Sequence, residues 1–428
     1  MLSVHFETFG CQMNVADSEM LADLLAQEGY RLLDSPDEAD LVVVNTCSVR
    51  AHAEDRARAR ITDFANAKRK RNPDQQLWVM GCMAQRLGEQ LRKEIPGVDR
   101  VIGAMAVESL HRDISEYLIK RDTARRYTPE PSGVSCFVPI MRGCDNYCAY
   151  CIVPYVRGHE HSLEAAEVAR SVRSLVERGV KEVTLLGQNV NSYHDRKGSD
   201  FPRLLRRLHE VDGLQRIRFT TSHPKDCGSD LIDTVAELPK LCKHFHLPVQ
   251  SGSTHILRRM NRGYTRDDYL RIIERIREAV PQADITTDVM TGFPGERESD
   301  FEETMSLFRH VRFTTAFMFA FSPRTGTAAA SMPDQLPAEI AKKRLNMLIE
   351  LQTEITRETY KAMVGNRVQA LITERQQKRD RKWMGRDHGC KRVLLACSDD
   401  LSGTILDLNV TGSSGMTLLC ERAQPCDS

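Results

Sequence analysis

Short apolar runs alternate with amphipathic stretches along roughly the first 115 residues of the chain. The runs are VHFETFG, DLVVVNT and LWVMG, and each precedes a stretch in which apolar residues recur with helical spacing. Short apolar runs separated by helices are typical of βαβ units, which build a parallel sheet. The pattern therefore predicts an α/β fold with a doubly wound parallel sheet in the N-terminal part.

Three cysteines follow these predicted strands. Cys11, Cys47 and Cys82 each lie after a strand, in the turn before the next helix. Open α/β sheets bind ligands at the carboxyl ends of their strands, so these thiols are expected at one edge. One cysteine in such a place is well explained as a buried structural thiol. Three in the same topological position favour a shared metal site, and both interpretations stay open here.

Residues 132–330 repeat the alternation on a longer scale. The six predicted strands are FVPIMRG, EVTLLGQN, RIRFTTSHP, HFHLPVQSGS, ITTDVMTGFPGE and AFMFAFSPRTGT, and each ends in polar or glycine-rich residues. Six parallel strands with functional groups at their carboxyl ends describe a full or partial β/α barrel, whose active site lies on that face.

A second group of cysteines lies after the first of these six strands, in MRGCDNYCAYCIVPYVRG. Cys144, Cys148 and Cys151 lie within eight residues. A structural zinc site takes four protein ligands, whereas an iron–sulfur cluster takes one cysteine for each iron. Three cysteines therefore indicate either a zinc site with a distant fourth ligand or a four-iron cluster with one open iron.

After a predicted helix that ends at Gly365, the sequence pattern changes to a series of short strand candidates. The strand candidates RVQALITE, KWMGRD, RVLLAC, SGTILDLNVTG and GMTLLCER are punctuated by Gly, Ser and Asp, which predicts a small β-barrel. Small barrels of this kind often bind oligonucleotides, and the basic stretch 375–382 fits a phosphate contact.

The composition also indicates the cellular compartment. The 428 residues carry a formal charge of +1, and no window reaches the roughly 20 apolar residues that a membrane helix needs. The first residues do not have the pattern of a signal peptide. We expect a cytoplasmic protein without membrane contact, in which 13 cysteines favour metal or catalytic sulfur over disulfides.

The spacing of the three-cysteine loop resembles that of the radical S-adenosylmethionine (SAM) enzymes, and further segments resemble the methylthiotransferases among them, most of all the MiaB type. These segments are TFGCQMNVADSE, NTCSVR, GCMAQ, LLGQNVNSY, RFTTSHP, LPVQSGS, MNRGYT, TGFPGE and FSPRTGT. The resemblance implies three domains: an N-terminal methylthiotransferase domain with an auxiliary cluster (1–117), a radical SAM domain (130–362) and a TRAM barrel (364–426).

The resemblance also implies two [4Fe-4S] clusters with different tasks. The cluster on Cys144, Cys148 and Cys151 would bind and cleave SAM, and the one on Cys11, Cys47 and Cys82 would carry the sulfur. One SAM methylates that sulfur, and a second supplies the radical that removes hydrogen from carbon 2 of isopentenyl(dimethylallyl)-adenosine beside the anticodon of tRNA. Partners would be this tRNA and a reductant protein such as a flavodoxin or ferredoxin, with the enzyme working as a monomer.

Further polar residues at predicted strand ends are candidates for binding SAM or the nucleoside. They are Gln188, Asn189, Thr221, Ser222, His223, Gln250, Ser251 and Gly292 to Glu296. Each also has a structural interpretation, since Asn and Ser cap helices and glycines make turns. No residue is assigned a catalytic role; His223 is a candidate, and it could equally be a hydrogen-bonded structural histidine.

The last domain matches the family least, because Asp387-His388-Gly389-Cys390 replaces a Thr-polar run. Two alternatives to the main hypothesis remain. One is a related methylthiotransferase that acts on threonylcarbamoyl-adenosine of tRNA or on a ribosomal-protein aspartate. The other is a non-catalytic iron–sulfur redox or RNA-binding protein.

Overall fold

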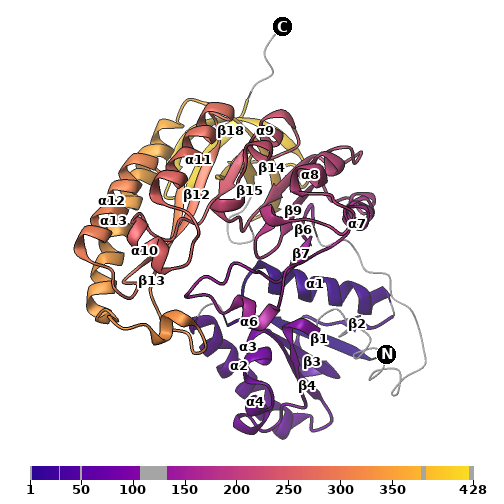
Figure 1. The fold of residues 1–428 in the computed structure, drawn as a ribbon. Coiled ribbons are helices and arrows are strands. Elements are labelled where there is room, and N and C mark those ends of the chain that lie inside the picture. Colours follow the sequence, from indigo (N-terminus) through magenta and orange to yellow (C-terminus); the bar gives the residue numbers. More distant parts are fainter. Residues whose placement is uncertain (1, 28, 49–50, 107–132, 377–381, 424–428) are drawn as a thin grey trace. The chain divides into compact units, whose positions relative to one another are not determined.

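The computed structural model describes residues 2–27, 29–48, 51–106, 133–376 and 382–423 (Figure 1). These residues form two units. Unit 1 contains the described part of residues 1–131 together with residues 142–145 and 151–161, and unit 2 contains the remainder. The three-cysteine loop is therefore divided, with Cys144 and Cys151 in unit 1 and Cys148 in unit 2.

Unit 1 is built on a five-stranded parallel sheet in the order β2-β1-β3-β4-β5. The strands are β1 (Ser3–Thr8), β2 (Arg31–Leu32), β3 (Leu41–Thr46), β4 (Gln76–Gly81) and β5 (Arg100–Gly103). The helices are α1 (Gln12–Gln27), α2 (Ala51–Arg71), α3 (Cys82–Leu87), α4 (Glu89–Glu94) and α6 (Val153–Arg157). Periodicity predicted β1, β3 and β4, but the short edge strands β2 and β5 carry too little apolar pattern to be recognised.

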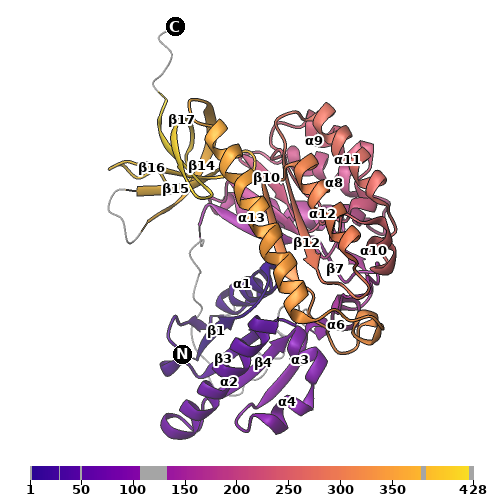
Figure 2. The same cartoon turned by 90° about the vertical axis from the view of Figure 1, so that its left-hand side faces the viewer.

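Helices cover both faces of this sheet, as the central strand β3 shows. Its Val44 packs in one core with Ile61 of α2, and the adjacent Val43 packs in a second core with Leu21 of α1. Figure 2 shows α1 and α2 beside the strands of this sheet. Successive side chains of a strand point to opposite faces, so a strand buried on both sides becomes a continuous apolar run. The predicted doubly wound sheet is confirmed.

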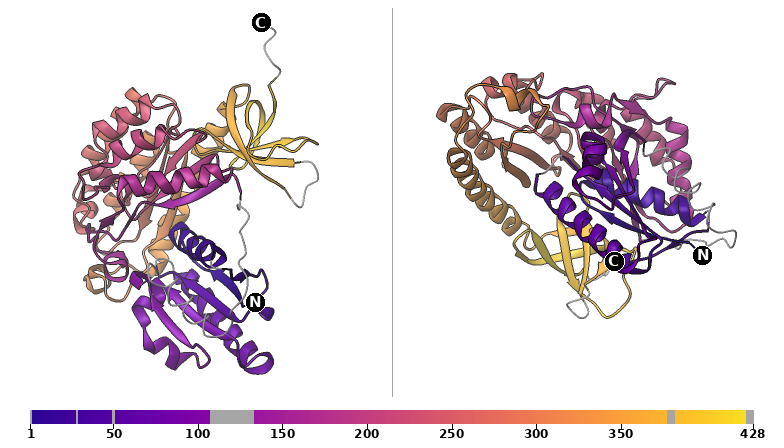
Figure 3. Two further views of the ribbon diagram at one scale, coloured as in Figure 1. Left: turned by 90° about the vertical axis from the view of Figure 1, so that its right-hand side faces the viewer. Right: turned by 90° about the horizontal axis from the view of Figure 1, so that it is seen from below.

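Unit 2 begins with six parallel strands in two three-stranded sheets, β10-β9-β6 and β11-β12-β13, connected by a parallel bridge from Ile217 to Leu241. The strands are β6 (Ser135–Pro139), β9 (Glu182–Leu186), β10 (Arg216–Phe219), β11 (His244–His246), β12 (Asp284–Thr291) and β13 (Thr315–Ala320). The helices are α7 (Ala165–Glu177), α8 (Phe201–His209), α9 (Ser229–Glu237), α10 (Thr254–Arg259), α11 (Arg266–Ala279) and α12 (Glu298–Val311). The helices lie along one side of the strands (Figures 1 and 3), which confirms the predicted partial β/α barrel.

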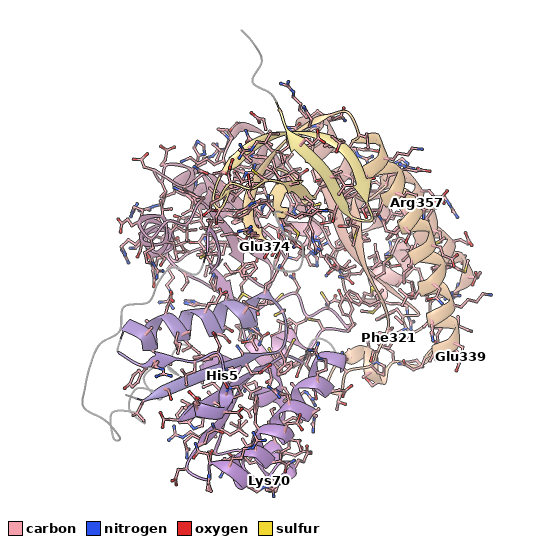
Figure 4. The ribbon with its side chains drawn as sticks, turned by 180° about the vertical axis from the view of Figure 1, so that it is seen from behind. His5, Lys70, Phe321, Glu339, Arg357 and Glu374 are labelled. Atoms are coloured by element: carbon pink, nitrogen blue, oxygen red, sulfur yellow. The ribbon has the colours of Figure 1, made fainter. Side chains whose placement is uncertain are left out.

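The 25-residue helix α13 (Ala338–Ala362) connects this barrel to the C-terminal domain. Glu339 and Arg357 label its two ends in Figure 4. Gln352 donates to the carbonyl of Phe313 (2.8 Å), and Tyr360 at the far end packs into the core of the next domain. In the described part of the chain, no helix combines the length and apolarity needed to span a bilayer.

The C-terminal domain is a closed barrel in the order β14-β15-β16-β18-β17, as predicted. Its strands are β14 (Arg367–Arg375), β15 (Lys382–Asp387), β16 (Arg392–Ala396), β17 (Ile405–Ser414) and β18 (Thr417–Arg422). The predicted phosphate contact in 375–382 falls largely on residues 377–381, which lie outside the described residues, as do the domain limits at 117 and 130.

The divergent segment Asp387–Lys391 docks onto the amino ends of the strands of the first barrel. Arg218 of β10 pairs with Glu182 (2.8 Å) and donates to the carbonyl of Asp387 (2.5 Å). Lys391 pairs with Asp284 of β12, whose carboxylate also accepts the backbone N–H of Cys390 (2.9 Å). Buried charges of this kind are tolerated only when each is paired. The segment that departs from the family pattern therefore connects the two domains of unit 2.

Candidate cluster and cofactor sites

Cys11, Cys47 and Cys82 lie at the carboxyl ends of the adjacent strands β1, β3 and β4. Cys11 lies at the exposed start of α1, whereas Cys47 and Cys82 are buried. Gly81 before Cys82 has φ +100°, and a Cβ there would meet the carbonyl oxygen of Thr46 at 2.3 Å. A close approach of two backbones at positive φ requires glycine, so Gly81 allows the ends of β3 and β4 to come together.

The electrostatics of this site favour thiolate at one of the cysteines. A hydrogen bond from the Cys47 thiol, together with the charge of Arg157, lowers the pKa of Cys11 to about 6. Burial raises the pKa of Cys82, and Arg157 opposes that rise. Thiolate is the form of cysteine that binds metal, so three thiols beside a cation suit a negatively charged cluster ligand set.

Two arginines that sequence reasoning did not single out complete this site. Arg142 precedes Cys144 and Arg157 follows Cys151, and both pair with Asp17 of α1 within unit 1, at 2.7 and 3.5 Å. Both arginines belong to the segment MRGCDNYCAYCIVPYVRG that contains the three-cysteine loop, but nothing in its spacing indicates which carboxylate they meet.

The cysteines of the loop have separate surroundings in the two units. In unit 1 the backbone N–H of Cys144 donates to the carbonyl of Gly158 (3.2 Å), and the Cys151 sulfur accepts the N–H of Val153 (3.4 Å). In unit 2 the Cys148 sulfur accepts a hydrogen bond from Arg262 (3.3 Å). Arg262 is almost fully buried and also donates to Tyr150 (3.4 Å).

No three His, Cys, Asp or Glu side chains of the described residues are arranged to hold a single metal ion. A four-iron cluster makes a different demand, because each thiolate binds its own iron. The donor chemistry of both groups, with three thiols in each, fits such a cluster.

Three of the predicted strand-end residues in unit 2 present buried polar atoms with no partner among the described residues. They are Gln188 through Oε1, Ser222 through Oγ and His223 through Nε2. Burial, followed by Arg262 and Lys225, lowers the pKa of His223 to about 2. The imidazole is therefore neutral, and its Nδ1 accepts the N–H of Lys225 (3.3 Å). A buried polar atom without a partner costs about 1–3 kcal/mol, which a bound ligand can offset.

The other predicted strand-end residues have structural contacts. Asn189 donates to Asp226 (2.7 Å) and accepts from the N–H of His223 (2.9 Å). Ser251 accepts the N–H of Ser253 (3.2 Å). Gln250 has φ +70°, and its N–H donates to the carbonyl of Asp288 (2.8 Å). Gly292 packs on α13, where a Cβ would meet Cβ of Ala341 at 2.3 Å.

Comparisons with known proteins agree with this geometry. One family model, the uncharacterized protein family UPF0004, matches residues 3–103, and the radical SAM superfamily matches residues 138–308. The tRNA-2-methylthio-N(6)-dimethylallyladenosine synthase of Syntrophotalea carbinolica is 44% identical over 438 residues, covering 99% of this chain and 100% of the relative. That of Geobacter metallireducens is 46% identical over 435 residues, covering 98% of both chains.

The chain belongs to this methylthiotransferase family. It is a radical SAM enzyme whose cofactors are SAM and [4Fe-4S] clusters. Among solved structures, the radical SAM methyltransferase TsrM from Kitasatospora setae matches with a TM-score of 0.57 at 16% identity, covering 77% of this chain and 75% of that chain. The cobalamin-dependent radical enzyme OxsB matches with a TM-score of 0.53 at 12% identity, covering 83% of this chain and 56% of that chain. At these identities the likeness concerns the fold.

Proposed function

We propose that the protein inserts a methylthio group at carbon 2 of isopentenyl(dimethylallyl)-adenosine beside the anticodon of tRNA, using two molecules of SAM. The observation that carries this proposal is the second three-thiol site at the strand ends of unit 1, in a chain that also has the radical SAM motif. A second thiol site of this kind can carry the sulfur that has to be inserted after the hydrogen is removed. The near full-length relation to the tRNA-modifying synthases supports the choice of substrate.

The two cysteine groups divide the work in this proposal. Cys144, Cys148 and Cys151 hold the cluster that binds SAM, and Cys11, Cys47 and Cys82 hold the auxiliary cluster. When bound, the clusters and SAM supply electron transfer, the radical and the sulfur, which side-chain acid–base chemistry cannot provide at an unactivated carbon–hydrogen bond. The residues of the chain bind, orient and shield the reactants.

Strand-end residues of unit 2 bind SAM or the nucleoside in this proposal. Gln188, Ser222 and His223 are the strongest candidates, because each offers a buried polar atom still without a partner among the described residues. Because Nδ1 of the neutral His223 ring accepts from Lys225, its Nε2–H can donate a hydrogen bond to a ligand without adding charge. The other strand-end residues contribute indirectly, because their contacts fix the backbone at the strand ends that carry these candidates. They are Asn189, Gln250, Ser251 and Gly292.

Three further parts of the proposal concern organisation. The domain limits are 1–117, 130–362 and 364–426, a flavodoxin or ferredoxin supplies electrons, and the enzyme works as a monomer. The pairing of Asp387–Lys391 with the first barrel favours treating the last two domains as one body.

The decisive experiment is anaerobic reconstitution with iron and sulfide, reduction with dithionite, and addition of SAM with isopentenylated tRNA. We expect 5′-deoxyadenosine and the methylthio nucleoside by mass spectrometry. Parallel reactions with threonylcarbamoylated tRNA and with a ribosomal-protein aspartate substrate separate the proposed activity from its relatives. Formation of neither product, with both clusters loaded, would mean a non-catalytic iron–sulfur protein.

A further inference from the structure

The turn after β10, which carries the buried His223, has a constrained backbone. His223 precedes Pro224, a position that favours extended backbone, and its φ and ψ are −109° and 130°. Thr221 has φ +68°, a rare conformation for a β-branched residue, and its carbonyl accepts the N–H of Val190 (3.0 Å). Strain of this kind persists only where surrounding contacts hold the chain, and it is commonest at functional sites.

The side chain of Asn191 supplies such contacts. Its Oδ1 accepts the backbone N–H of His223 (2.9 Å), and its Nδ2 donates to the backbone carbonyl of the same residue (3.0 Å). A hydrogen-bonded residue pair of an antiparallel ladder has the same two bonds. Asn189 shares the N–H of His223 (2.9 Å), but its amide donates to Asp226 (2.7 Å). Asn191 therefore holds both polar groups of the His223 main chain.

The ring of His223 is left with one donor for a ligand. Its Nδ1 accepts the N–H of Lys225 (3.3 Å), so in the neutral ring the proton lies on Nε2. This Nε2 is buried without a partner among the described residues, and so is the Oγ of the adjacent Ser222. The two residues are only 4% and 6% exposed. Because a buried donor is costly without an acceptor, the pair suits a ligand that presents acceptor atoms.

The imidazole lies on the side of the barrel where unit 2 contributes to the radical SAM loop. It packs edge-on against the ring of Tyr264, with the two centroids 5.6 Å apart. The Tyr264 hydroxyl accepts from Arg262 (3.1 Å), which also donates to the Cys148 sulfur (3.3 Å). SAM and the substrate nucleoside have to meet at this loop. Both contain an adenosine, whose ribose oxygens and ring nitrogens are hydrogen-bond acceptors.

We infer that Asn191 is a positioning residue for an adenosine ligand: its carboxamide fixes the main chain of His223 so that the Nε2–H of the ring donates to an acceptor of that adenosine. The inference rests on the proposed function, because it takes SAM and the isopentenyl-adenosine of tRNA as the ligands. Asn191 does not contact the ligand itself. Its loss therefore matters only while the imidazole is present, and a double-mutant cycle measures this dependence.

The test measures ligand affinity with full-length protein that is reconstituted with both clusters and kept oxidised, so that SAM is not cleaved. Asn191→Ala, His223→Ala and the double variant are compared with the parent protein. SAM is titrated without RNA by equilibrium dialysis, and an isopentenylated anticodon stem-loop RNA is titrated without SAM by fluorescence anisotropy. Asn366→Ala is the matched control, because the amide of Asn366 also donates to a main-chain carbonyl, that of Ala362 (3.3 Å).

We expect Asn191→Ala and His223→Ala each to weaken the binding of SAM, of the RNA or of both about tenfold, as for the loss of one hydrogen bond. The double variant should also lose about tenfold, instead of the roughly hundredfold loss expected of independent sites. The arm that shows the loss identifies which adenosine is bound. Iron per chain stays unchanged, since no cysteine is altered, and Asn366→Ala keeps both affinities.

Two outcomes overturn the inference. One is an unchanged affinity for both ligands in Asn191→Ala. The other is a further tenfold loss when Asn191→Ala is added to His223→Ala, because Asn191 would then act independently of the ring.

A second variant covers the case in which Asn191→Ala does not fold. Asn191→Asp keeps an acceptor for the N–H of His223 but sets a carboxylate oxygen against its carbonyl. It should weaken binding in the parent protein and have no further effect in His223→Ala; any other result contradicts the inference. If the parent protein binds its ligands but forms no methylthio nucleoside when reduced, the proposed function fails, and the cycle still decides the role of Asn191 in SAM binding.

Discussion

Each of the two cysteine triads brings three thiols together, one through proximity in sequence and the other through the folded sheet. Cys144, Cys148 and Cys151 lie within eight residues, so their proximity follows from the loop itself. Cys11, Cys47 and Cys82 are separated by 36 and 35 residues, from 47 − 11 and 82 − 47, and only a folded sheet aligns them. A buried arginine accompanies each triad: Arg262 donates to the Cys148 sulfur (3.3 Å), and Arg157, whose charge acts on Cys82, pairs with Asp17 (3.5 Å).

At the first triad, iron binding therefore depends on tertiary structure, because the fold has to bring the three thiols together. At the second triad, the loop sequence already keeps the three thiols close to one another. Ligand sites that need distant segments are lost when the domain unfolds, because binding and folding share one free energy. Unfolding of the N-terminal sheet should therefore disperse the first triad, whereas the three thiols of the second triad stay within eight residues of one another, and that expectation can be tested in several ways.

The largest effect is expected from removing each triad. Cys11→Ala/Cys47→Ala/Cys82→Ala should lose about half of the iron, as two four-iron clusters require, and should still cleave SAM while forming no methylthio product. Cys144→Ala/Cys148→Ala/Cys151→Ala should lose a similar amount of iron and all SAM cleavage. Iron analysis and detection of 5′-deoxyadenosine measure both; unchanged iron in the first variant contradicts the auxiliary cluster.

Unfolding of unit 1 should have the next largest effect. Trp78 of β4 is fully buried, so Trp78→Ala should cost about 3–5 kcal/mol of its stability and lower iron toward half. The chain has two tryptophans, so the fluorescence of Trp383 in β15 then reports on the C-terminal barrel alone. Trp78→Phe is the control. Loss of all iron, with a normal Trp383 transition, would show that the second triad also depends on unit 1.

A smaller effect should follow from Gly81→Ala. The new Cβ would collide with the carbonyl of Thr46 (2.3 Å) at φ +100°, costing about 1–3 kcal/mol and displacing Cys82. Gly88→Ala is the matched control, since Gly88 also has positive φ (+52°) but no atom lies within 4 Å of an added Cβ. Reconstituted iron should fall in the first variant only; equal loss in both would assign the effect to backbone strain.

The smallest expected effect concerns the reactivity of the individual cysteines of the first triad in the protein without clusters. Because its pKa is lowered to about 6, Cys11 should remain thiolate and react with iodoacetamide down to about pH 6, whereas Cys82, with a raised pKa, should react only at alkaline pH. Mass spectrometry of alkylation against pH gives each midpoint. Cys47→Ala removes the thiol that donates to Cys11, so the Cys11 midpoint should rise toward its usual value; an unchanged midpoint contradicts this cause.

Much of the architecture was predictable because it depends on local pattern. The buried strand β3 and the polar strand ends after β9 and β10 are visible as apolar runs followed by polar residues. The alignment of Cys11, Cys47 and Cys82 follows from strand position alone. The α/β class, the partial barrel and the C-terminal barrel were predicted on the same grounds.

What could not be predicted are pairings between distant segments. No periodicity connects Asp17 to Arg157, or Arg218 to the carbonyl of Asp387, since these contacts join residues far apart in sequence. Gly292 is another example: its sequence context suggested a ligand-binding turn, but its missing side chain makes room for Ala341 of α13.

The small helix α6 has a consequence for how such enzymes can be recombined. It comes from residues 153–157 but completes the apolar core around Cys82 and Ala104 in unit 1. The N-terminal sheet is therefore not a cassette that can be cut at a linker and grafted onto another radical enzyme. A chimera that exchanges the first hundred residues must exchange the cysteine loop and α6 with them, or redesign the surface where they meet.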